Sequence, residues 1–273
     1  MAIKVCVAGM TGWTGSAVAK ALVAAEGFEL SAGIARAKAG EDAGSALGLA
    51  PLGLRVSRDL EEALATPFDV LVDFTRPDSV KARVLAAVAA GKGVVIGTSG
   101  LSAADYADIA QAAETRGVGV VAAGNFSITA ALASHFAQEA ARFLPWCEVI
   151  DYAHEDKVDA PSGTARELAE KLGGIRPSAE AVPLDRLHGY PEARGASIGG
   201  TRVHSLRLPG FVIAFETLFG LPHERLSIRH DAGSGAEPYV AGTLLAAKKA
   251  LAIRGLVRGL DTLLFPAPEE SVP

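Results

Sequence analysis

The sequence predicts an α/β protein with an N-terminal Rossmann-type, doubly wound parallel sheet and a central α+β domain with an antiparallel or mixed sheet. Three observations lead to this fold class. A glycine-rich turn joins the first apolar strand to an alanine-rich helix. Short apolar strands then alternate with helices as far as Asn125. Beyond residue 200, longer strands follow one another and are separated by turns.

The first half of the chain supplies the elements of the parallel sheet. The hydrophobic pattern predicts strands over 3–7, 28–34, 54–56, 70–74, 93–96 and 118–122. Between them it predicts helices over 16–25, 59–65, 79–90 and 102–115. Such alternation implies right-handed crossovers, with helices on both faces of the sheet.

The second half changes character. We predict a long helix over 127–143, a strand over 148–153 and, after a stretch rich in Pro and Gly (173–200), strands over 202–208, 211–219 and 225–230. These last three strands suggest an antiparallel meander. A helix over 239–253 has one apolar stripe, and we expect it to pack on the N-terminal domain.

Composition restricts the class of protein and of ligand. The chain has 273 residues, of which 49% are hydrophobic and 21% charged, with 30 glycines, as is typical of an α/β enzyme. The net charge of −5 and the absence of a basic run argue against a nucleic-acid partner. No apolar segment reaches membrane-spanning length, and we expect a cytoplasmic protein without a signal peptide. Cys6 and Cys147 offer no disulfide framework, and the scattered histidines predict no metal site.

The glycine-rich turn indicates a nucleotide site. Gly9, Gly12 and Gly15 follow the first strand and open the first helix, where the pyrophosphate of a dinucleotide binds in this fold class. Ser16 follows the third glycine, where a P-loop would carry lysine, so a P-loop is excluded. Glycines at such a turn also occur for tight packing alone.

The end of the second strand bears on cofactor choice. An NAD site usually places an acidic residue there to bind the ribose hydroxyl. This chain has Arg36 with Lys38 nearby, which suit the 2′-phosphate of NADPH. We therefore predict NADPH, with NADH as the alternative cofactor, although two solvated surface cations would look the same in the sequence.

Polar loops follow three further strands, at 74–77, 97–100 and 124–127. The carboxyl ends of parallel strands line the cofactor crevice in this fold class. We expect Asp73, at the end of one strand, to be structural rather than catalytic. The predicted cofactor-binding residues are Gly9, Thr11, Gly12, Trp13, Thr14, Gly15, Arg36, Lys38, Phe74, Thr75, Gly97, Thr98, Ser99, Gly124, Asn125 and Phe126.

The segment 157–165, Lys-Val-Asp-Ala-Pro-Ser-Gly-Thr-Ala, precedes a good helix former. Asp159 or Ser162 can cap that helix. The free N–H groups around Ser162, Gly163 and Thr164 then face an incoming anion, with the Lys157 ammonium beside them. The segment therefore suits a carboxylate or phosphate, and the alternative is an ordinary capped helix with a solvated lysine.

These motifs, in this order, resemble the 4-hydroxy-tetrahydrodipicolinate (dihydrodipicolinate) reductase family of bacterial lysine biosynthesis. The resemblance covers nearly the whole chain: 9–15, 40–44, 72–75 with Pro77, 97–100, 125–127, 157–165 and 228–231. It implies an NAD(P)H-dependent oxidoreductase that reduces a cyclic imine-type dicarboxylate, with a dinucleotide-binding domain (1–126 with 239–273) and a substrate-binding and oligomerisation domain (127–238). It also implies a homotetramer built through the sheets of the substrate domains.

The resemblance implies roles for individual residues. His154, Lys157, Ser162, Gly163 and Thr164 would contact the substrate. Gly12 would lie against the pyrophosphate, while Gly97, Thr98 and the backbone of Asn125 and Phe126 would orient the nicotinamide. We take Lys157 and His154 as catalytic. Lys157 would stabilise the negative charge that hydride delivery places on a conjugated C=N, and His154 or water would donate the proton.

Three positions depart from the family pattern. Ala153 replaces the first of two adjacent histidines, the proposed proton donor; Gly235 stands where an arginine holds a substrate carboxylate; and Trp13 replaces an arginine of the glycine turn. Arg194 and Arg229 are candidates for the missing arginine's role. Two alternatives therefore stay open, a related reductase for another imine or unsaturated dicarboxylate and an NADPH-binding sensor without turnover.

Overall fold

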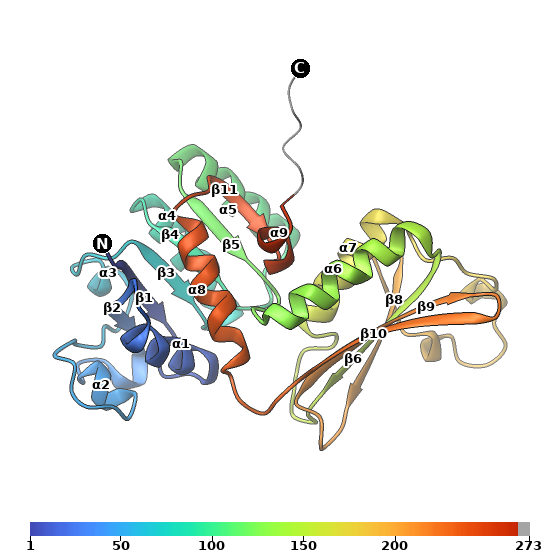
Figure 1. Cartoon of the computed structure of the whole chain (residues 1–273), viewed down its shortest axis with the longest axis horizontal. Coiled ribbons are helices and arrows are strands. Elements are labelled where there is room, and N and C mark those ends of the chain that lie inside the picture. The colour runs from blue at the N-terminus through green and yellow to red at the C-terminus, as the bar shows by residue number, and fades with distance from the viewer. Residues whose placement is uncertain (267–273) are drawn as a thin grey trace. The chain divides into compact units, whose positions relative to one another are not determined.

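The computed structural model describes residues 1–266. The chain divides into two compact units: unit 1 is Met1–Ile128 together with the chain from Ala236 onward, and unit 2 is Thr129–Gly235. Each unit contains its own sheet and its own hydrophobic core (Figure 1).

Unit 1 is built on a six-stranded parallel sheet with the order β11-β5-β4-β3-β1-β2, which confirms the predicted doubly wound fold. The strands are β1 (Ile3–Ala8), β2 (Phe28–Ile34), β3 (Val70–Asp73), β4 (Gly93–Ile96), β5 (Gly119–Ala122) and β11 (Gly255–Arg258). After β2 the chain returns to the other side of β1 to form β3. Ligands bind at such a switch point, outside the carboxyl ends of the strands.

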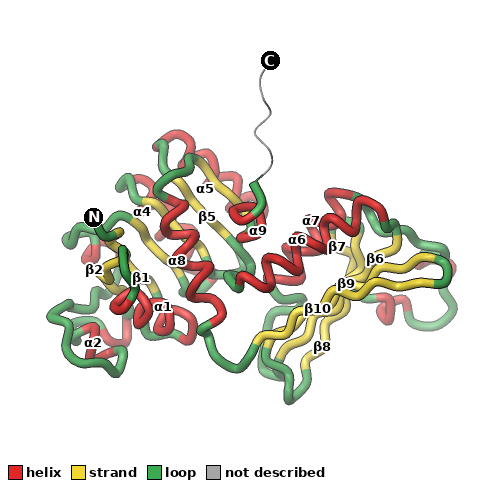
Figure 2. The backbone as a smooth tube through the Cα atoms, viewed as in Figure 1, coloured by secondary structure: helices red, strands yellow, loops and turns green. Residues whose placement is uncertain are grey.

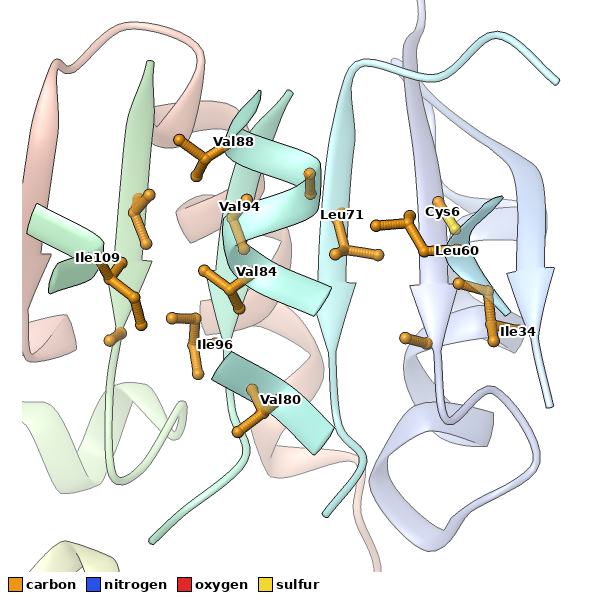
Figure 3. Packing of buried hydrophobic residues seen from close by; sticks show 14 of the residues in the cluster. Cys6, Ile34, Leu60, Leu71, Val80, Val84, Val88, Val94, Ile96 and Ile109 are labelled. Atoms are coloured by element: carbon orange, nitrogen blue, oxygen red, sulfur yellow. The ribbon is translucent and has the colours of Figure 1, made fainter. Parts of the chain in front are cut away.

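Helices cover both faces of this sheet, which is why β3, β4 and β5 are buried at every position. On one face lie α1 (Trp13–Ala24) and α8 (Pro238–Ala250), and on the other α3 (Leu60–Ala63), α4 (Pro77–Ala89) and α5 (Ala103–Arg116). In Figure 3, Val80, Val84 and Val88 of α4 point toward the core residues of β3 and β4. The short helices α2 (Ala43–Ala46) and α9 (Leu260–Leu264) complete the unit.

Three element predictions were wrong in detail. The segment 54–56 forms no strand and makes only isolated bridges, Asp42 with Arg55 and, one residue beyond the segment, Ile34 with Ser57. The first helix begins at Trp13 rather than at residue 16, because Gly12 is its N-cap. The last long helix ends at Ala250, and the sequence analysis missed β11, a short edge strand that pairs only with β5.

Unit 2 contains a five-stranded mixed sheet with the order β10-β9-β6-β8-β7. Its strands are β6 (Trp146–Ala153), β7 (Ala196–Ile198), β8 (Thr201–Arg207), β9 (Ile213–Leu221) and β10 (Glu224–Ala232). The predicted meander is wrong for its first pair, because β6 lies between β8 and β9, parallel to the former and antiparallel to the latter. Strands far apart along the chain pair with one another in this sheet, so the order of the strands in space differs from their order along the chain.

One face of this sheet is covered by α6 (Ile128–Phe143) and α7 (Gly163–Ile175), as Figure 2 shows. Leu168 and Leu172 of α7 share a buried cluster with Val149, Phe215 and Phe219 of the sheet. Residues of β6 alternate between buried and half-buried, so Asp151 and Ala153 face the helices. Two 3-10 turns, Leu184–Arg186 and Pro191–Arg194, lie between α7 and β7.

Candidate active site

The glycine turn after β1 has no room for side chains. Gly9 has φ +79, and a Cβ there would lie 2.2 Å from the Phe74 carbonyl oxygen. A Cβ on Gly15 would lie 2.1 Å from the Gly9 carbonyl oxygen. Gly12 caps α1 without a side-chain hydrogen bond, and the first turn of α1 carries no acidic residue. The positive end of the helix dipole therefore faces the turn unopposed, as a site for a diphosphate requires.

Asp73 organises the loops beside this turn. Its buried carboxylate accepts hydrogen bonds from the Thr75 backbone N–H at 3.0 Å, the Thr75 hydroxyl at 2.6 Å and the Thr98 hydroxyl at 2.9 Å. Arg83 Nη1 lies 2.6 Å from the same carboxylate. The hydroxyls of Thr75 and Thr98 are thus engaged in fixing two neighbouring strand ends. Within residues 1–266, the Asp73 carboxylate contacts only these loop residues and Arg83 of α4, as a structural residue would.

A cavity of about 450 Å³ opens beside the glycine turn. Among the predicted cofactor residues it is lined by Gly9, Thr11, Gly12, Arg36, Phe74 and Thr75. Lys38 does not line it, and its ammonium lies 3.2 Å from Glu41. Arg76, in the predicted loop 74–77, also lines the cavity, as do Arg58 and Arg83, which the sequence analysis missed. A nucleotide with several phosphates fits this excess of positive charge.

The remaining predicted cofactor residues lie around this cavity without lining it. Phe74 and Phe126 meet edge to face, with ring centroids 5.8 Å apart. A Cβ on Gly97 would lie 2.0 Å from the Phe74 ring, so glycine is required for that packing. The Asn125 side chain accepts a hydrogen bond from the Ser127 N–H at 2.8 Å. Ser99 and Gly124 are exposed, Thr14 is half-buried, and Gly15 packs inside the turn.

Trp13 occupies the first position of α1. Its ring meets that of Tyr239 edge to face, with centroids 5.7 Å apart, and its side chain is half exposed. Burial raises the pKa of the Tyr239 hydroxyl, which therefore stays protonated. The contact ties the start of α1 to the start of α8.

In unit 2, Lys157 and His154 lie on the loop between β6 and α7. The Lys157 ammonium is 2.5 Å from Asp159 Oδ1, and its side chain is mostly buried. The Lys157 N–H donates to the His154 carbonyl oxygen at 3.2 Å, which closes a turn, and the His154 side chain is exposed. Ser162, rather than Asp159, is the N-cap of α7: its hydroxyl accepts from the Ala165 N–H at 3.2 Å. Gly163 and Thr164 form the first turn of α7.

Asp151 and Arg207 hold this loop, and the sequence analysis missed both. Asp151 Oδ1 accepts from the Ser162 hydroxyl at 2.7 Å, and Oδ2 accepts from the Ser162 N–H at 2.9 Å. Arg207 Nη2 donates to Asp151 Oδ2 at 2.8 Å and to the Asp159 carbonyl oxygen at 2.5 Å. The only sequence signal was a carboxylate at an inward position of a strand, which requires a buried partner.

The two arginines considered as replacements at Gly235 are engaged elsewhere. Arg229 forms two hydrogen bonds of 2.7 Å with Asp231 and lies over the Tyr152 ring. Arg194 pairs with Glu148, which also accepts from His204 at 2.8 Å. Burial raises the pKa of Glu148, but the hydrogen bonds from His204 and Arg194 outweigh it and leave that pKa below its ordinary value.

Burial lowers the pKa of His230, on β10, so its imidazole favours the neutral form.

Residues 1–266 contain no group of three or more His, Cys, Asp or Glu side chains that could hold a metal ion. Burial raises the pKa of Cys147 to about 12, and that of Cys6 is raised further, so neither thiol is a nucleophile near neutral pH. Within the same range, none of the helices has the length and apolar composition needed to cross a bilayer.

Comparison with known proteins places both units in one family. The family described as "Dihydrodipicolinate reductase, N-terminus" matches residues 3–126, and "Dihydrodipicolinate reductase, C-terminus" matches residues 129–264. The 4-hydroxy-tetrahydrodipicolinate reductase of Desulfitobacterium hafniense is 39% identical over 267 residues, covering 96% of this chain and 98% of the relative. That of Moorella thermoacetica is 40% identical over 263 residues, with the same coverage of each chain.

A solved structure agrees. A dipicolinate-bound dihydrodipicolinate reductase from Paenisporosarcina sp. TG-14 superimposes with a TM-score of 0.77 at 30% identity, covering 96% of this chain and 100% of that one. An amine dehydrogenase from Mycobacterium smegmatis, at 16% identity and a TM-score of 0.65, shares the fold alone.

Proposed function

This chain belongs to the dihydrodipicolinate reductase family, and from that premise we propose that it reduces 4-hydroxy-tetrahydrodipicolinate to tetrahydrodipicolinate in lysine and diaminopimelate biosynthesis. The chain is an oxidoreductase with a nucleotide-binding Rossmann domain. The observation that carries the assignment of the substrate is the loop of unit 2. There Lys157, mostly buried, pairs with Asp159, and the buried Asp151 carboxylate fixes the start of α7 through Ser162. A dicarboxylate needs such positive groups.

The cofactor would bind at the carboxyl ends of the sheet of unit 1. Gly9 and Gly12, with the first turn of α1, would hold the diphosphate. Gly97, Thr98 and the Asn125–Phe126 segment would orient the nicotinamide beside the Phe74 and Phe126 rings. Trp13, Thr14, Gly15, Ser99 and Gly124 shape the same loops. The bound nicotinamide supplies the hydride.

The substrate would be held by unit 2. Gly163 and Thr164 would donate to one carboxylate from the helix start. Lys157 would stabilise the negative charge that develops when the ring accepts a hydride, exchanging its contact with Asp159 for the substrate. Ser162 acts chiefly by fixing the helix start, because Asp151 takes up both its N–H and its hydroxyl. Together, one hydride and one proton enter, and the 4-hydroxyl leaves as water.

The proton would come from His154 or from water. His154 is exposed at the end of β6, and Ala153 offers no second imidazole beside it. An imidazole can donate near neutral pH, and bulk water has access to the same loop.

We further propose NADPH as the preferred cofactor, a homotetramer and a cytoplasmic location. Arg36 at the cavity supports NADPH. The face of the unit 2 sheet opposite α6 and α7 carries half-exposed Trp146, and the family forms tetramers through such sheets. The two free, buried cysteines suit a reducing compartment.

A coupled assay tests the function. The substrate is generated in the cuvette by the upstream synthase from pyruvate and aspartate semialdehyde, and the fall in NADPH absorbance is followed. We expect oxidation that depends on both synthase and reductase. A reaction lacking the synthase is the control, and no oxidation above that control with either cofactor would overturn the assignment.

Ala153 and Gly235 favour one second candidate, a reductase for a related imine or unsaturated dicarboxylate. Turnover of such a compound at a higher kcat/KM than the synthase product would support it. Cofactor binding without consumption of any compound in a panel of keto and imino acids would instead indicate a sensor.

A further inference from the structure

Two arginines at the cavity of unit 1 have no acidic partner among residues 1–266. Four arginines line this cavity: Arg36, Arg58, Arg76 and Arg83. Arg83 is paired with the buried Asp73, and Arg76 lies 3.9 Å from Asp78. Arg36 and Arg58 form no ion pair in the described chain, although both are exposed at the cavity. Their charge is therefore available to a ligand.

The fold brings these two arginines together from separate segments. Ile34, at the end of β2, and Ser57 form an isolated parallel bridge, with Ala35 N–H donating to the Ser57 carbonyl at 3.0 Å. Arg58 directly follows one side of that bridge, and Arg36 stands two residues after the other side. Ile34 and Leu60, each two residues from one of the arginines in sequence, are both buried in the core cluster (Figure 3). Packing of these two buried side chains thus holds the backbone that carries both arginines at the β2 edge of the sheet.

The backbone at Arg58 is held as well. Its N–H donates to Glu62 Oε2 at 2.7 Å, and Asp59 caps α3 by accepting from the Glu62 N–H at 3.0 Å. Asp59 is the one carboxylate among the residues that line the cavity. The lining therefore carries four arginines against this single carboxylate.

The proposed function assigns NADPH to this site, and the inference rests on it. We propose that Arg58 joins Arg36 in binding the 2′-phosphate of NADPH, and that Arg58 is a specificity-determining residue for the cofactor. Lys38, which the sequence grouped with Arg36 for this role, lies 3.2 Å from Glu41 and does not line the cavity. A guanidinium presents several donors in a plane and matches a phosphate better than an ammonium does. Two arginines from different segments surround one phosphate, whereas either alone leaves part of it to solvent.

The test measures equilibrium binding, not turnover. The purified full chain, free of nicotinamide cofactor, is titrated calorimetrically with 2′,5′-ADP and with 5′-AMP. These two probes share the adenosine and differ in the 2′-phosphate. The variants are Arg58→Gln, Arg36→Gln and Lys38→Gln, with Arg116→Gln, exposed at the end of α5, as the charge-matched control. Thermal unfolding without ligand checks that each variant is folded.

We expect the wild type to bind 2′,5′-ADP more tightly than 5′-AMP. Arg58→Gln and Arg36→Gln should each weaken 2′,5′-ADP binding about 10-fold or more, and 5′-AMP binding less than about 2-fold, because a charge-assisted contact to phosphate is lost. Lys38→Gln and Arg116→Gln should change the ratio of the two affinities less than about 2-fold.

If Arg58→Gln leaves the ratio of the 2′,5′-ADP and 5′-AMP affinities unchanged, the inference is overturned. It is also overturned if Lys38→Gln loses as much 2′,5′-ADP affinity as Arg58→Gln does. A wild type that binds the two probes equally well would overturn it too. The coupled assay separates this failure from failure of the proposed function. A wild type that turns over the synthase product but whose Arg58→Gln variant keeps the ratio refutes Arg58 alone. A wild type that distinguishes the probes but shows no turnover refutes only the reaction.

Discussion

The Asp151 carboxylate accepts two hydrogen bonds from Ser162, one from its hydroxyl at 2.7 Å and one from its backbone N–H at 2.9 Å. One residue lies on β6 and the other caps α7, so the loop that carries His154 and Lys157 is closed at its base. Arg207 completes the closure from β8 by reaching both Asp151 and the backbone of Asp159.

Asp151→Asn should loosen this loop. The amide removes one acceptor and the charge that faces Arg207, and breaking a buried ion pair costs about 3–5 kcal/mol. We expect a lower melting temperature and a KM for the substrate that rises more than kcat falls. Asp156→Asn, on the exposed part of the same loop, is the control. A variant with wild-type KM would show that the closure does not position the loop.

Lys157→Ala should lower kcat/KM for the synthase product by at least about 10²-fold, because the site loses the cation that stabilises developing charge. The measurement is the coupled assay at saturating cofactor. Val158→Ala, at the neighbouring and fully exposed position, should keep near-normal activity. Near-normal turnover in Lys157→Ala would refute the catalytic role.

His154→Ala distinguishes the two proton donors. If the imidazole donates, the wild-type rate requires its protonated form, and the variant should lose the fall in rate that the wild type shows as pH rises. The measurement is the pH dependence of kcat/KM between about pH 5.5 and pH 9. A pH profile identical to that of the wild type would assign the proton to water.

Two adjacent glycines of α7 should respond to alanine with opposite signs. A Cβ on Gly173 would lie 1.9 Å from the Gly199 carbonyl oxygen, whereas a Cβ on Gly174 would meet nothing within 4 Å. Gly173→Ala should therefore lower the free energy of unfolding by about 1–3 kcal/mol or more, as overpacking does. Gly174→Ala should raise it by up to about 1 kcal/mol through helix propensity. Urea denaturation of both variants measures this, and equal effects would contradict the close approach of α7 to the β7–β8 turn.

Protonation of the Glu148 carboxylate in acid should lower the free energy of unfolding of unit 2. Its pKa is lower in the folded protein than in the unfolded chain, so its contribution to stability is complete above the unfolded pKa, about 4.3. That contribution is lost as pH falls through the lower, folded pKa. The difference in unfolding free energy between wild type and Glu148→Gln should therefore shrink between about pH 6 and pH 3. A difference that does not change over this range would contradict the shift.

Local sequence rules predicted much of both sites. Gly9 and Gly15 were recognisable because only glycine fits where backbones approach so closely. Ser162 was recognisable as a helix cap because a hydroxyl residue stands just before a helix-forming run. The strands of unit 1 were recognisable because strands covered on both faces are apolar throughout.

The errors in strand order concern long-range pairing. β8 and β9 follow each other in sequence, yet β6 separates them, and β11 exists only as a partner of β5. Lys38 stands two residues after Arg36 and was grouped with it; in the structure Lys38 lies 3.2 Å from Glu41 and does not line the cavity.

The sequence alone determined the class of the fold, the glycine turn, the capped helix behind Lys157 and, through its motifs, the family. Each of these depends on backbone sterics or hydrogen bonds within a few residues. Only the tertiary structure decided that Asp151 and Arg207 close the loop that carries His154 and Lys157, and that Arg58 lines the same cavity as Arg36. Such groups lie far apart along the chain, and their approach depends on which buried strands pair and which apolar side chains pack, which is a property of the whole unit.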